Sequence, residues 1–371
     1  MTDNLTNRTA DISVEKTEHL KGLAVLLLMW HHLFGVGYIT DWIEIIPNSK
    51  NIVFIFGASS KICLAIFLFC SGYGLFKSYI SKEMPRKNYI LKRLVKIFIP
   101  YWMIMAISIA YLAYAGKFDP KYFFVNLFVL NISDEVLYTS FAWFVKLYIL
   151  LILITPLIKM IELKWKKNIF LDLLIYIAVP FAAAVLFGKF IEDMGFTGIP
   201  ALLMNSVLLV IAWLPLFSVG MLASKYEVYN LIRKAADKLP RVLCSFLMFV
   251  IICFTFFVRY MTNLYIKNTV LYPNCMLDVI YGPIVIGSLI IILDNLKYKS
   301  RYVIPFIGRN SIHYWLLSGM FFHNTIELAV LITWPRGAPF ILIWTMVLLT
   351  PFVFLCSWLS DKAVKLIFKG S

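Results

Sequence analysis

The chain carries little charge for its length. Of its 371 residues, 15% are Asp, Glu, Lys or Arg, whereas 61% are hydrophobic, and the mean hydropathy is +0.83. A soluble domain of this size needs far more charge to cover its surface, so this composition excludes a soluble fold. It indicates a polytopic membrane protein.

Several other features are scarce or missing. The six cysteines show no CxxC or metal-ligand spacing and fall in or beside apolar segments, so we interpret them as small core residues and expect no disulfide framework. No Ser/Gly-rich or Pro-rich linker and no fixed-period repeat separates one part of the chain from another. Residues 1–19 lack the basic region, short apolar stretch and cleavage site of a secretory signal, so the first apolar segment is predicted to be a retained helix.

Apolar segments long enough to cross about 30 Å of hydrocarbon recur along the whole chain. They predict an all-α membrane protein with a short N-terminal segment (1–19), one transmembrane domain (20–360) and a C-terminal tail (361–371). The ten predicted transmembrane segments are residues 20–37, 52–79, 92–115, 141–162, 169–188, 203–224, 242–263, 276–293, 308–331 and 339–360.

The net charge of +15 does not indicate a nucleic-acid partner, because the cations neither form one patch nor cover a soluble face. They concentrate in the N-terminal segment, in every second connection and in the tail. By the positive-inside rule, this alternation predicts that both termini are cytoplasmic and that the number of crossings is even, most simply ten.

A histidine pair, His31 and His32, lies deep in the first segment. Lys21 precedes His32 by eleven positions, or roughly 16 Å at about 1.5 Å per helical residue, which places His32 past the bilayer midplane if Lys21 lies at the cytoplasmic face. Ionisable groups at such depth face protein or water and are candidates for function. An interfacial or core histidine is the alternative.

A metal site is not predicted. Helical histidine ligands favour i, i+4 spacing, and only three further histidines exist, His19, His313 and His323. The sequence gives no role to His31, His313 or His323.

The second segment offers further candidates. Lys61 is predicted in the outer half of the membrane, near the depth of His32, where a lysine either extends to the surface or serves a cavity. Ser71 and Tyr73 follow within Phe67–Gly74, which combines small residues with two hydroxyls. Close helix packing through Ser71 and Gly72 is the alternative to a role in a site.

Three cations, Lys92, Arg93 and Lys96, occupy one turn at the inner end of the third segment. Cations at this position are common as determinants of membrane topology. They could equally form a binding site for the phosphates of a cytoplasmic donor, since Arg binds phosphate bidentately and Lys acts as a point charge.

These motifs, taken in order, resemble the acyltransferase 3 family of membrane acyltransferases, in particular branches that modify bacterial surface polysaccharides. Lys21 and His32 fit the family's opening Arg-ten-residues-His pattern, with Lys in place of Arg. The stretch from Lys61 to Tyr73 resembles its second-helix pattern, with Ala65 in place of a frequent Pro. The match continues through Arg93–Lys96 with Pro100-Tyr101, Trp143-Phe144, Gly220-Met221 and Phe306–Ser311, while Ser318 replaces a late His found in many members.

The resemblance implies transfer of an acyl group, usually acetyl, from cytoplasmic acetyl-CoA or another acyl-CoA across the bacterial cytoplasmic membrane. The acceptor it implies is a hydroxyl of a cell-surface or lipid-linked glycan, with O-acetylation of capsule or exopolysaccharide as the leading case. The donor is a co-substrate, and neither a permanently bound cofactor nor a metal is expected. Because the chain has no fused extracytoplasmic domain, either the glycan receives the acyl group directly or a separate extracytoplasmic transferase completes the reaction.

The resemblance also assigns roles. His32 is the expected general base, acting on the acceptor or on a relay hydroxyl, Tyr73 or Ser71. Lys61 stabilises an oxyanion or orients the histidine. The donor's phosphates are expected to bind Lys21, Arg93 and Lys96.

Two other functions fit the composition. A flippase or exporter of an anionic glycan precursor would also have many helices, charged residues at depth and a basic inner surface. A sensor or scaffold without catalytic activity finds support only in the hydrophobicity.

Overall fold

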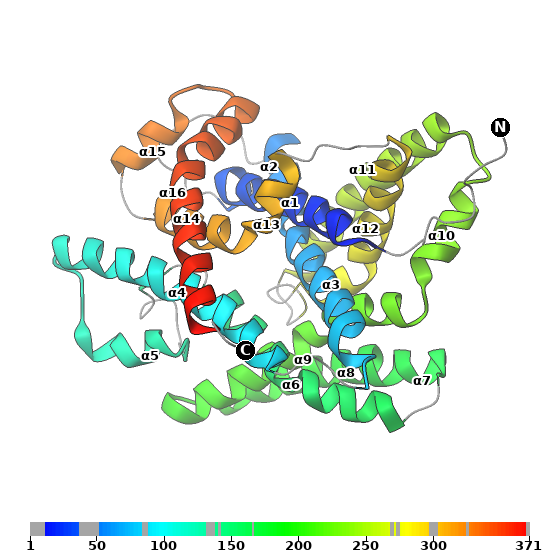
Figure 1. Ribbon diagram of the computed structural model, residues 1–371, viewed down its shortest axis with the longest axis horizontal. Coiled ribbons are helices and arrows are strands. Elements are labelled where there is room, and N and C mark those ends of the chain that lie inside the picture. Colours follow the sequence, from blue (N-terminus) through cyan, green and yellow to red (C-terminus); the bar gives the residue numbers. More distant parts are fainter. Residues whose placement is uncertain are drawn as a thin grey trace.

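Helices form every secondary-structure element in the described part of the chain, which comprises residues 12–36, 52–83, 88–130, 138–139, 142–164, 167–267, 271, 275–296, 303–323 and 326–368 of this computed structural model. In lipid a helix satisfies its own backbone hydrogen bonds, which explains why apolar sequence of this kind folds in this way. Figure 1 shows the helices, which are, in chain order, α1 (Val14–Trp30), α2 (Ile52–Ser59), α3 (Cys63–Leu75), α4 (Tyr89–Tyr114), α5 (Phe123–Leu127), α6 (Ala142–Lys164), α7 (Ile169–Leu173), α8 (Val179–Met194), α9 (Gly198–Lys225), α10 (Val228–Ala236), α11 (Arg241–Ile266), α12 (Asp278–Asn295), α13 (Val303–Arg309), α14 (Ser311–His323), α15 (Ile326–Thr333) and α16 (Ala338–Ile367).

Short turns of other helix types join or extend several of these helices. Single π-helical turns follow α1, α3 and α7, and 3-10 turns precede α3 and α5. They are η1 (His31–Gly35), η2 (Ser60–Ile62), η3 (Phe76–Ile80), η4 (Pro120–Tyr122) and η6 (Leu174–Ala178).

Eight of the predicted transmembrane segments are confirmed as helices long and apolar enough to cross a membrane. Each agrees with its predicted segment to within a few residues at most ends. The eight are Ile52–Ile80, Tyr89–Tyr114, Ala142–Lys164, Ile169–Met194, Gly198–Lys225, Arg241–Ile266, Asp278–Asn295 and Ala338–Ile367.

The predicted segments 20–37 and 308–331 are not among these eight. Regular α-helix in the first segment ends at Trp30 after 17 residues and continues only as the turn η1. The second is divided among the end of α13, all of α14 and part of α15. The total of ten crossings and the cytoplasmic position of both termini therefore stay predictions.

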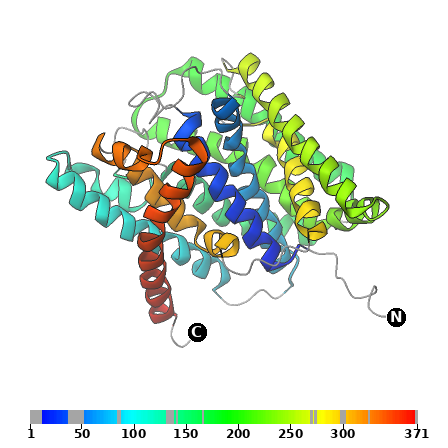
Figure 2. The ribbon, with the colours of Figure 1, turned by 90° about the horizontal axis from the view of Figure 1, so that it is seen from above.

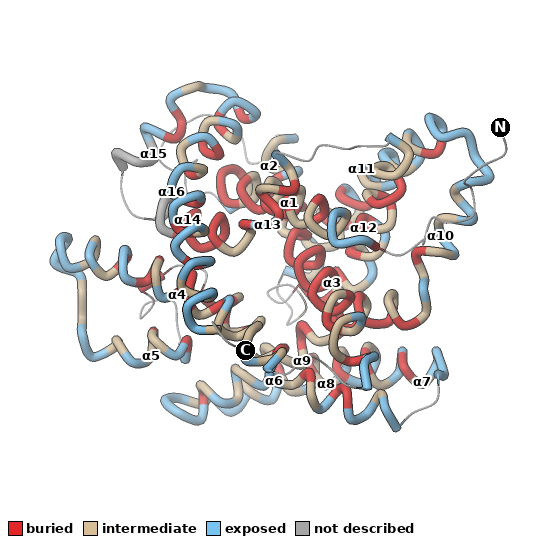
Figure 3. The backbone as a smooth tube through the Cα atoms, viewed as in Figure 1, coloured by how far each residue is buried: buried red, intermediate tan, exposed pale blue. Residues whose placement is uncertain are grey.

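The segment Ile52–Ile80 forms the centre of the protein. Within its most apolar stretch 61% of the residues are buried, against 17% for α11. Figure 3 shows the same contrast, with buried residues gathered on α1 and α3 and exposed residues on peripheral helices such as α11 and α16. Seen from above, α1 and α3 lie between α11 on one side and α4 on the other (Figure 2). The exposed apolar faces of the outer helices are the surfaces that lipid covers.

Glycines allow the central helices to touch backbone to backbone. A Cβ added to Gly72 of α3 would lie 1.9 Å from the Phe217 carbonyl oxygen of α9, and one added to Gly220 of α9 would lie 2.1 Å from the Phe69 carbonyl oxygen. The contact between α1 and α13 is of the same kind, since a Cβ on Gly308 would lie 1.8 Å from the Glu18 carbonyl oxygen. Small residues at crossings of this kind are what membrane helices use to pack closely.

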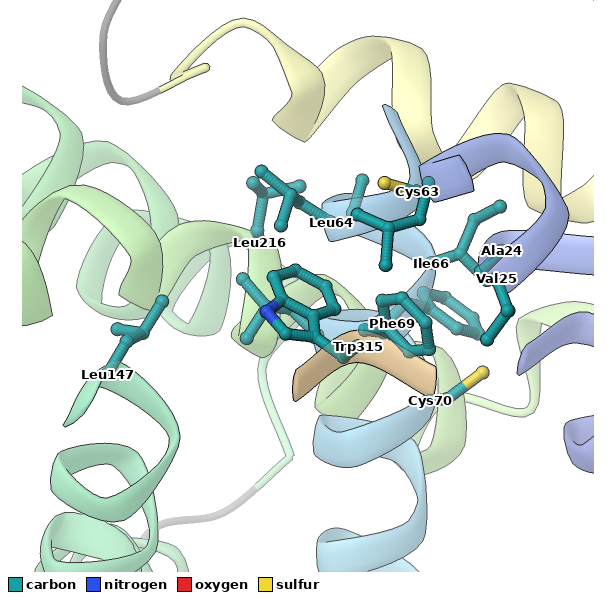
Figure 4. Close-up of a cluster of buried hydrophobic side chains, with 14 of the residues drawn as sticks. Ala24, Val25, Cys63, Leu64, Ile66, Phe69, Cys70, Leu147, Leu216 and Trp315 are labelled. Atoms are coloured by element: carbon teal, nitrogen blue, oxygen red, sulfur yellow. The ribbon is translucent and has the colours of Figure 1, made fainter. Parts of the chain in front are cut away.

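All six cysteine thiols are free. Five are buried, as expected for small core residues, and Cys63 and Cys70 lie in the cluster that Figure 4 shows around α3. Cys253 differs, because it lies exposed on α11.

Candidate active site

A cavity of about 520 Å³ opens among five helices that are far apart in the sequence. Its wall comes from α1, α3, α4, α6 and α14, and the lining residues are Lys21, Phe67, Ser71, Tyr89, Lys92, Arg93, Lys96, Ile97, Phe144, Val145, Tyr148, Ser311, Ile312, Trp315 and Leu316. The size and the mixed lining suit a small-molecule site.

Four cations line this cavity, Lys21 from α1 and Lys92, Arg93 and Lys96 from the first two turns of α4. The described lining contains no Asp or Glu. No described carboxylate forms an ion pair with Lys21, Arg93 or Lys96 either. The structure thus brings together the three residues predicted to bind the donor and adds Lys92 as a fourth. Such a cluster attracts a ligand with several negative charges.

Tyrosines hold the Arg93 guanidinium. Its Nε and Nη2 donate to the Tyr89 hydroxyl at 3.1 and 2.8 Å. On the other side the Tyr148 hydroxyl hydrogen-bonds to both Arg93 and Ser71. Because its protein partners among the described residues are phenols rather than carboxylates, Arg93 keeps its full charge for an anionic ligand.

Three aromatic rings, Phe67, Phe144 and Trp315, form one wall of the cavity, which we call the aromatic wall. Phe144 and Trp315 are stacked with ring centroids 4.3 Å apart, and Phe67 meets the edge of Trp315 at 5.4 Å. Figure 4 shows the Trp315 indole among the apolar side chains around α3. The lining of the cavity therefore combines basic and aromatic side chains.

The two histidines lie farther along α1, in the turn η1. His32 is buried, and the His31 and His32 ring centroids are 5.3 Å apart. His31 Nδ1 lies 2.9 Å from the Gly57 carbonyl oxygen of α2. Lys21, at the cavity, is eleven positions earlier, so the helical rise separates His32 from it by roughly 16 Å.

Lys61 lies close enough to the histidines for its charge to act on one of them. It belongs to η2, and its charge acts on the His31 ring. It also hydrogen-bonds to Cys275, whose thiol pKa is raised by burial.

The two candidate relay hydroxyls lie away from His32. Ser71 faces the cavity that Lys21 also lines, and its Oγ donates to the Phe67 carbonyl at 2.8 Å. Tyr73 is outside that cavity, and its hydroxyl accepts from the backbone N–H of Ile12 at 3.1 Å. Ile12 precedes α1, about 20 residues before His32, which corresponds to roughly 30 Å along the chain if it were helical throughout. The structure therefore groups Ser71 with the cations that line the cavity and Tyr73 with the N-terminal segment.

The other histidines lie in different places. His313, on α14, is buried with Nε2 3.2 Å from the Ser360 hydroxyl of α16. The side chain of His323 falls outside the described part of the structure. Among the described residues, no group of three His, Cys, Asp or Glu side chains has an arrangement that could hold a metal ion.

One buried ion pair near the histidines was not predicted from the sequence. Arg259 of α11 is 1% exposed and donates from Nε and Nη2 to the two carboxylate oxygens of Asp278 of α12, at 2.6 and 2.8 Å. Two features of the sequence could have indicated this pair: Arg259 lies well inside one apolar segment, and Asp278 lies at the start of the next. Charged residues in such positions rarely lack a partner of opposite charge.

The comparison with protein families matches residues 15–361 to the family described as an acyltransferase domain. The chain belongs to the acyltransferase 3 family. This result confirms the resemblance read from the Lys21–His32 spacing and the later motifs. No curated protein and no solved structure gave a match. The protein is thus a membrane acyltransferase, and both the basic cavity and the buried histidines lie within the matched residues.

Proposed function

We propose that this acyltransferase takes an acetyl group from cytoplasmic acetyl-CoA and passes it to a hydroxyl of a cell-surface or lipid-linked glycan. The product is an O-acetylated capsule or exopolysaccharide. His32 is the general base of the transfer, and Lys61 stabilises the negative charge that develops on the reacting carbonyl oxygen.

The single observation that carries this proposal is the cavity with four cations and no described carboxylate. Coenzyme A carries three phosphate groups on a nucleotide and a long uncharged arm that ends in the thioester. Charge-assisted hydrogen bonds from Arg93 and the lysines suit the phosphates. The aromatic wall suits the uncharged arm.

The position of His32 supports the direction of transfer. Lys92, Arg93 and Lys96 lie near the N-terminal end of α4, on the side that the positive-inside rule assigns to the cytoplasm. His32 lies roughly 16 Å from Lys21 along α1. A neutral imidazole titrates near the working pH and accepts a hydroxyl proton efficiently. This layout supports a transfer in which the donor binds towards the cytoplasm and the proton is taken up towards the outside.

A test of the function compares the surface glycan of the producing strain with that of a strain lacking this gene. We expect the deletion strain to lack an O-acetyl ester, detected by mass spectrometry and NMR. Purified protein in lipid vesicles should then move label from acetyl-labelled acetyl-CoA to the glycan of the deletion strain. Movement of glycan across the vesicle without any donor would instead support a transporter, and an unchanged ester content would contradict the proposal.

Replacing Arg93 by alanine tests the donor site. Because the guanidinium makes charge-assisted contacts to phosphate, each worth about 1.5–3 kcal/mol, we expect the KM for acetyl-CoA to rise about 10- to 100-fold while kcat changes little. Arg93→Lys should fall in between, since a lysine keeps the charge and loses the fork.

Lys164→Ala is the matched control for Arg93→Ala. It removes one exposed cation from the end of α6, outside the cavity, and should leave the KM for acetyl-CoA unchanged. Equal effects of the two substitutions would contradict a specific role for Arg93.

The topology of the chain in the bacterial cytoplasmic membrane is a separate prediction. Reporters fused before residue 1 and after residue 371 should both report from the cytoplasm, and a reporter inserted after Gly116 should report from outside. An external signal from only one terminus would contradict an even number of crossings, and external signals from both would contradict the predicted orientation.

A further inference from the structure

Three consecutive backbone carbonyls at the end of α2 accept hydrogen bonds from side chains of other helices. The Gly57 carbonyl faces His31 Nδ1 at 2.9 Å, while those of Ala58 and Ser59 accept from Arg259 Nη1 at 3.3 and 3.2 Å. Directly after them the chain tightens from α-helix into the 3-10 turn η2. The position of this turn is therefore fixed from two sides, by a histidine of the proposed site and by a buried arginine.

The turn η2 carries Lys61. Its charge and that of Arg259 both act on the His31 ring. A shift of η2 would move Lys61 relative to His31 and His32. The contacts that fix η2 therefore also fix the position of Lys61 relative to these histidines.

The turn also sets the tautomer of His31. A carbonyl oxygen only accepts hydrogen bonds, so a neutral His31 carries its proton on Nδ1, where it is donated to Gly57. Nε2 is then the nitrogen with a lone pair. The ring beside His32 thus has a defined donor and a defined acceptor.

Arg259 can hold the turn because Asp278 balances its charge. Both residues are almost completely buried, and the fork-to-fork contact fixes the guanidinium plane. Asp278 lies in the first turn of α12, where the helix dipole favours a carboxylate. The remaining guanidinium nitrogen, Nη1, points to the carbonyls of α2.

We propose that Arg259, held by Asp278, is a positioning residue of the acyl-transfer site. It fixes the turn at Gly57–Ile62, and through that turn it aligns Lys61 and sets the tautomer of His31. This inference rests on the proposed function, because alignment of the site is measured through the transfer reaction.

The decisive variant is the double substitution Arg259→Leu with Asp278→Leu. Replacing a buried ion pair by apolar residues of similar volume is often neutral for stability, whereas removing one partner leaves a buried charge uncompensated. If the pair aligns the site, the double variant should melt like the wild type and keep its KM for acetyl-CoA, while kcat falls on the order of 100-fold. A kcat close to that of the wild type would overturn the proposal, since the pair would then serve only to fold the protein.

Arg259→Lys keeps the test decisive if the double variant does not fold. A lysine keeps a positive charge beside Asp278, and its single ammonium group cannot bridge the carboxylate and both carbonyls of α2. We expect kcat to fall on the order of tenfold with KM unchanged, and an unchanged kcat would overturn the proposal.

The matched control is Arg233→Leu with Asp237→Leu. This is also an Arg–Asp ion pair, with Arg233 Nη2 2.8 Å from Asp237, but it lies nearer the surface, with Asp237 exposed and Arg233 also in contact with Asn295. It lies on and just after α10, and neither residue lines the cavity. It should leave kcat unchanged. If the wild-type protein transfers no acetyl group, the proposed function itself is contradicted. If the wild type transfers acetyl and the Arg259→Leu/Asp278→Leu variant does so equally well, only this inference is contradicted.

Discussion

Replacing His32 by alanine is expected to lower kcat for acyl transfer by about 10²- to 10⁴-fold, the usual contribution of a general base. The KM for acetyl-CoA should stay within about twofold, because the donor-binding cations begin roughly 16 Å away along α1. The measurement is steady-state transfer of labelled acetyl by purified protein in lipid vesicles, with acetyl-CoA binding followed separately by calorimetry. His32→Gln, which fills more of the same volume, should show the same loss.

His19→Asn is the control for His32→Ala. His19 lies near the start of the same helix, also buried, with Nδ1 2.8 Å from the Glu15 carbonyl oxygen. An asparagine amide can donate to that carbonyl in place of Nδ1, so transfer should continue at the wild-type rate. A His32→Ala variant as active as His19→Asn would remove His32 from the mechanism.

Replacing Gly72 by alanine is expected to disrupt folding. The new methyl group would lie 1.9 Å from the Phe217 carbonyl oxygen, and the obstacle is backbone, which no side-chain rotation can remove. The crossing of α3 and α9 must therefore open along its length, at a cost of about 3 kcal/mol or more. We expect a markedly lower melting temperature and little monodisperse protein after solubilisation, measured by size-exclusion chromatography after heating.

Gly74→Ala is the matched control, two residues farther along α3. A Cβ at Gly74 meets no atom within 4 Å, so this substitution should change stability by less than about 1 kcal/mol. Equal melting of the two variants would show that α3 and α9 do not approach as closely as described.

The sequence predicted most of the helices because hydrocarbon thickness and helical rise leave few other arrangements for an apolar run. Segments such as 52–79 and 141–162 were therefore found nearly at their true limits, whereas 169–188 ended six residues before the helix does at Met194. Length and hydropathy were less informative for 20–37 and 308–331. There the chain departs from a single continuous α-helix, through η1 in the first case and through the divisions between α13, α14 and α15 in the second.

The grouping of Lys21, Arg93 and Lys96 was predictable because the positive-inside rule assigned all three to the same end of their helices, and the structure has all three in the lining of one cavity. The relay hydroxyls were assigned from their place in a motif, without regard to the direction of the helix. Since α3 runs from Lys61 towards the cavity, its later residues lie farther from the histidines, and Ser71 reaches the cavity instead.

The pairing of Arg259 with Asp278 could not be read from the sequence. The two residues are 19 positions apart on different helices, and which buried charges meet depends on how those helices pack. The same is true of Arg259 and the carbonyls of α2, about 200 positions away. Patterns along one helix contain no information about contacts of this kind.

The contact between α1 and α13 has a consequence for how the protein is made. The ribosome must add about 290 residues between Gly22 and Gly308, which takes roughly 15 to 60 s at about 5 to 20 residues per second. Throughout that time the first helix, with its lysine and histidines, is already synthesised but lacks the neighbours that cover it in the finished protein. A nascent chain that stops before α14 has no Ser311 or Trp315, so the cavity is complete only after most of the chain has been made.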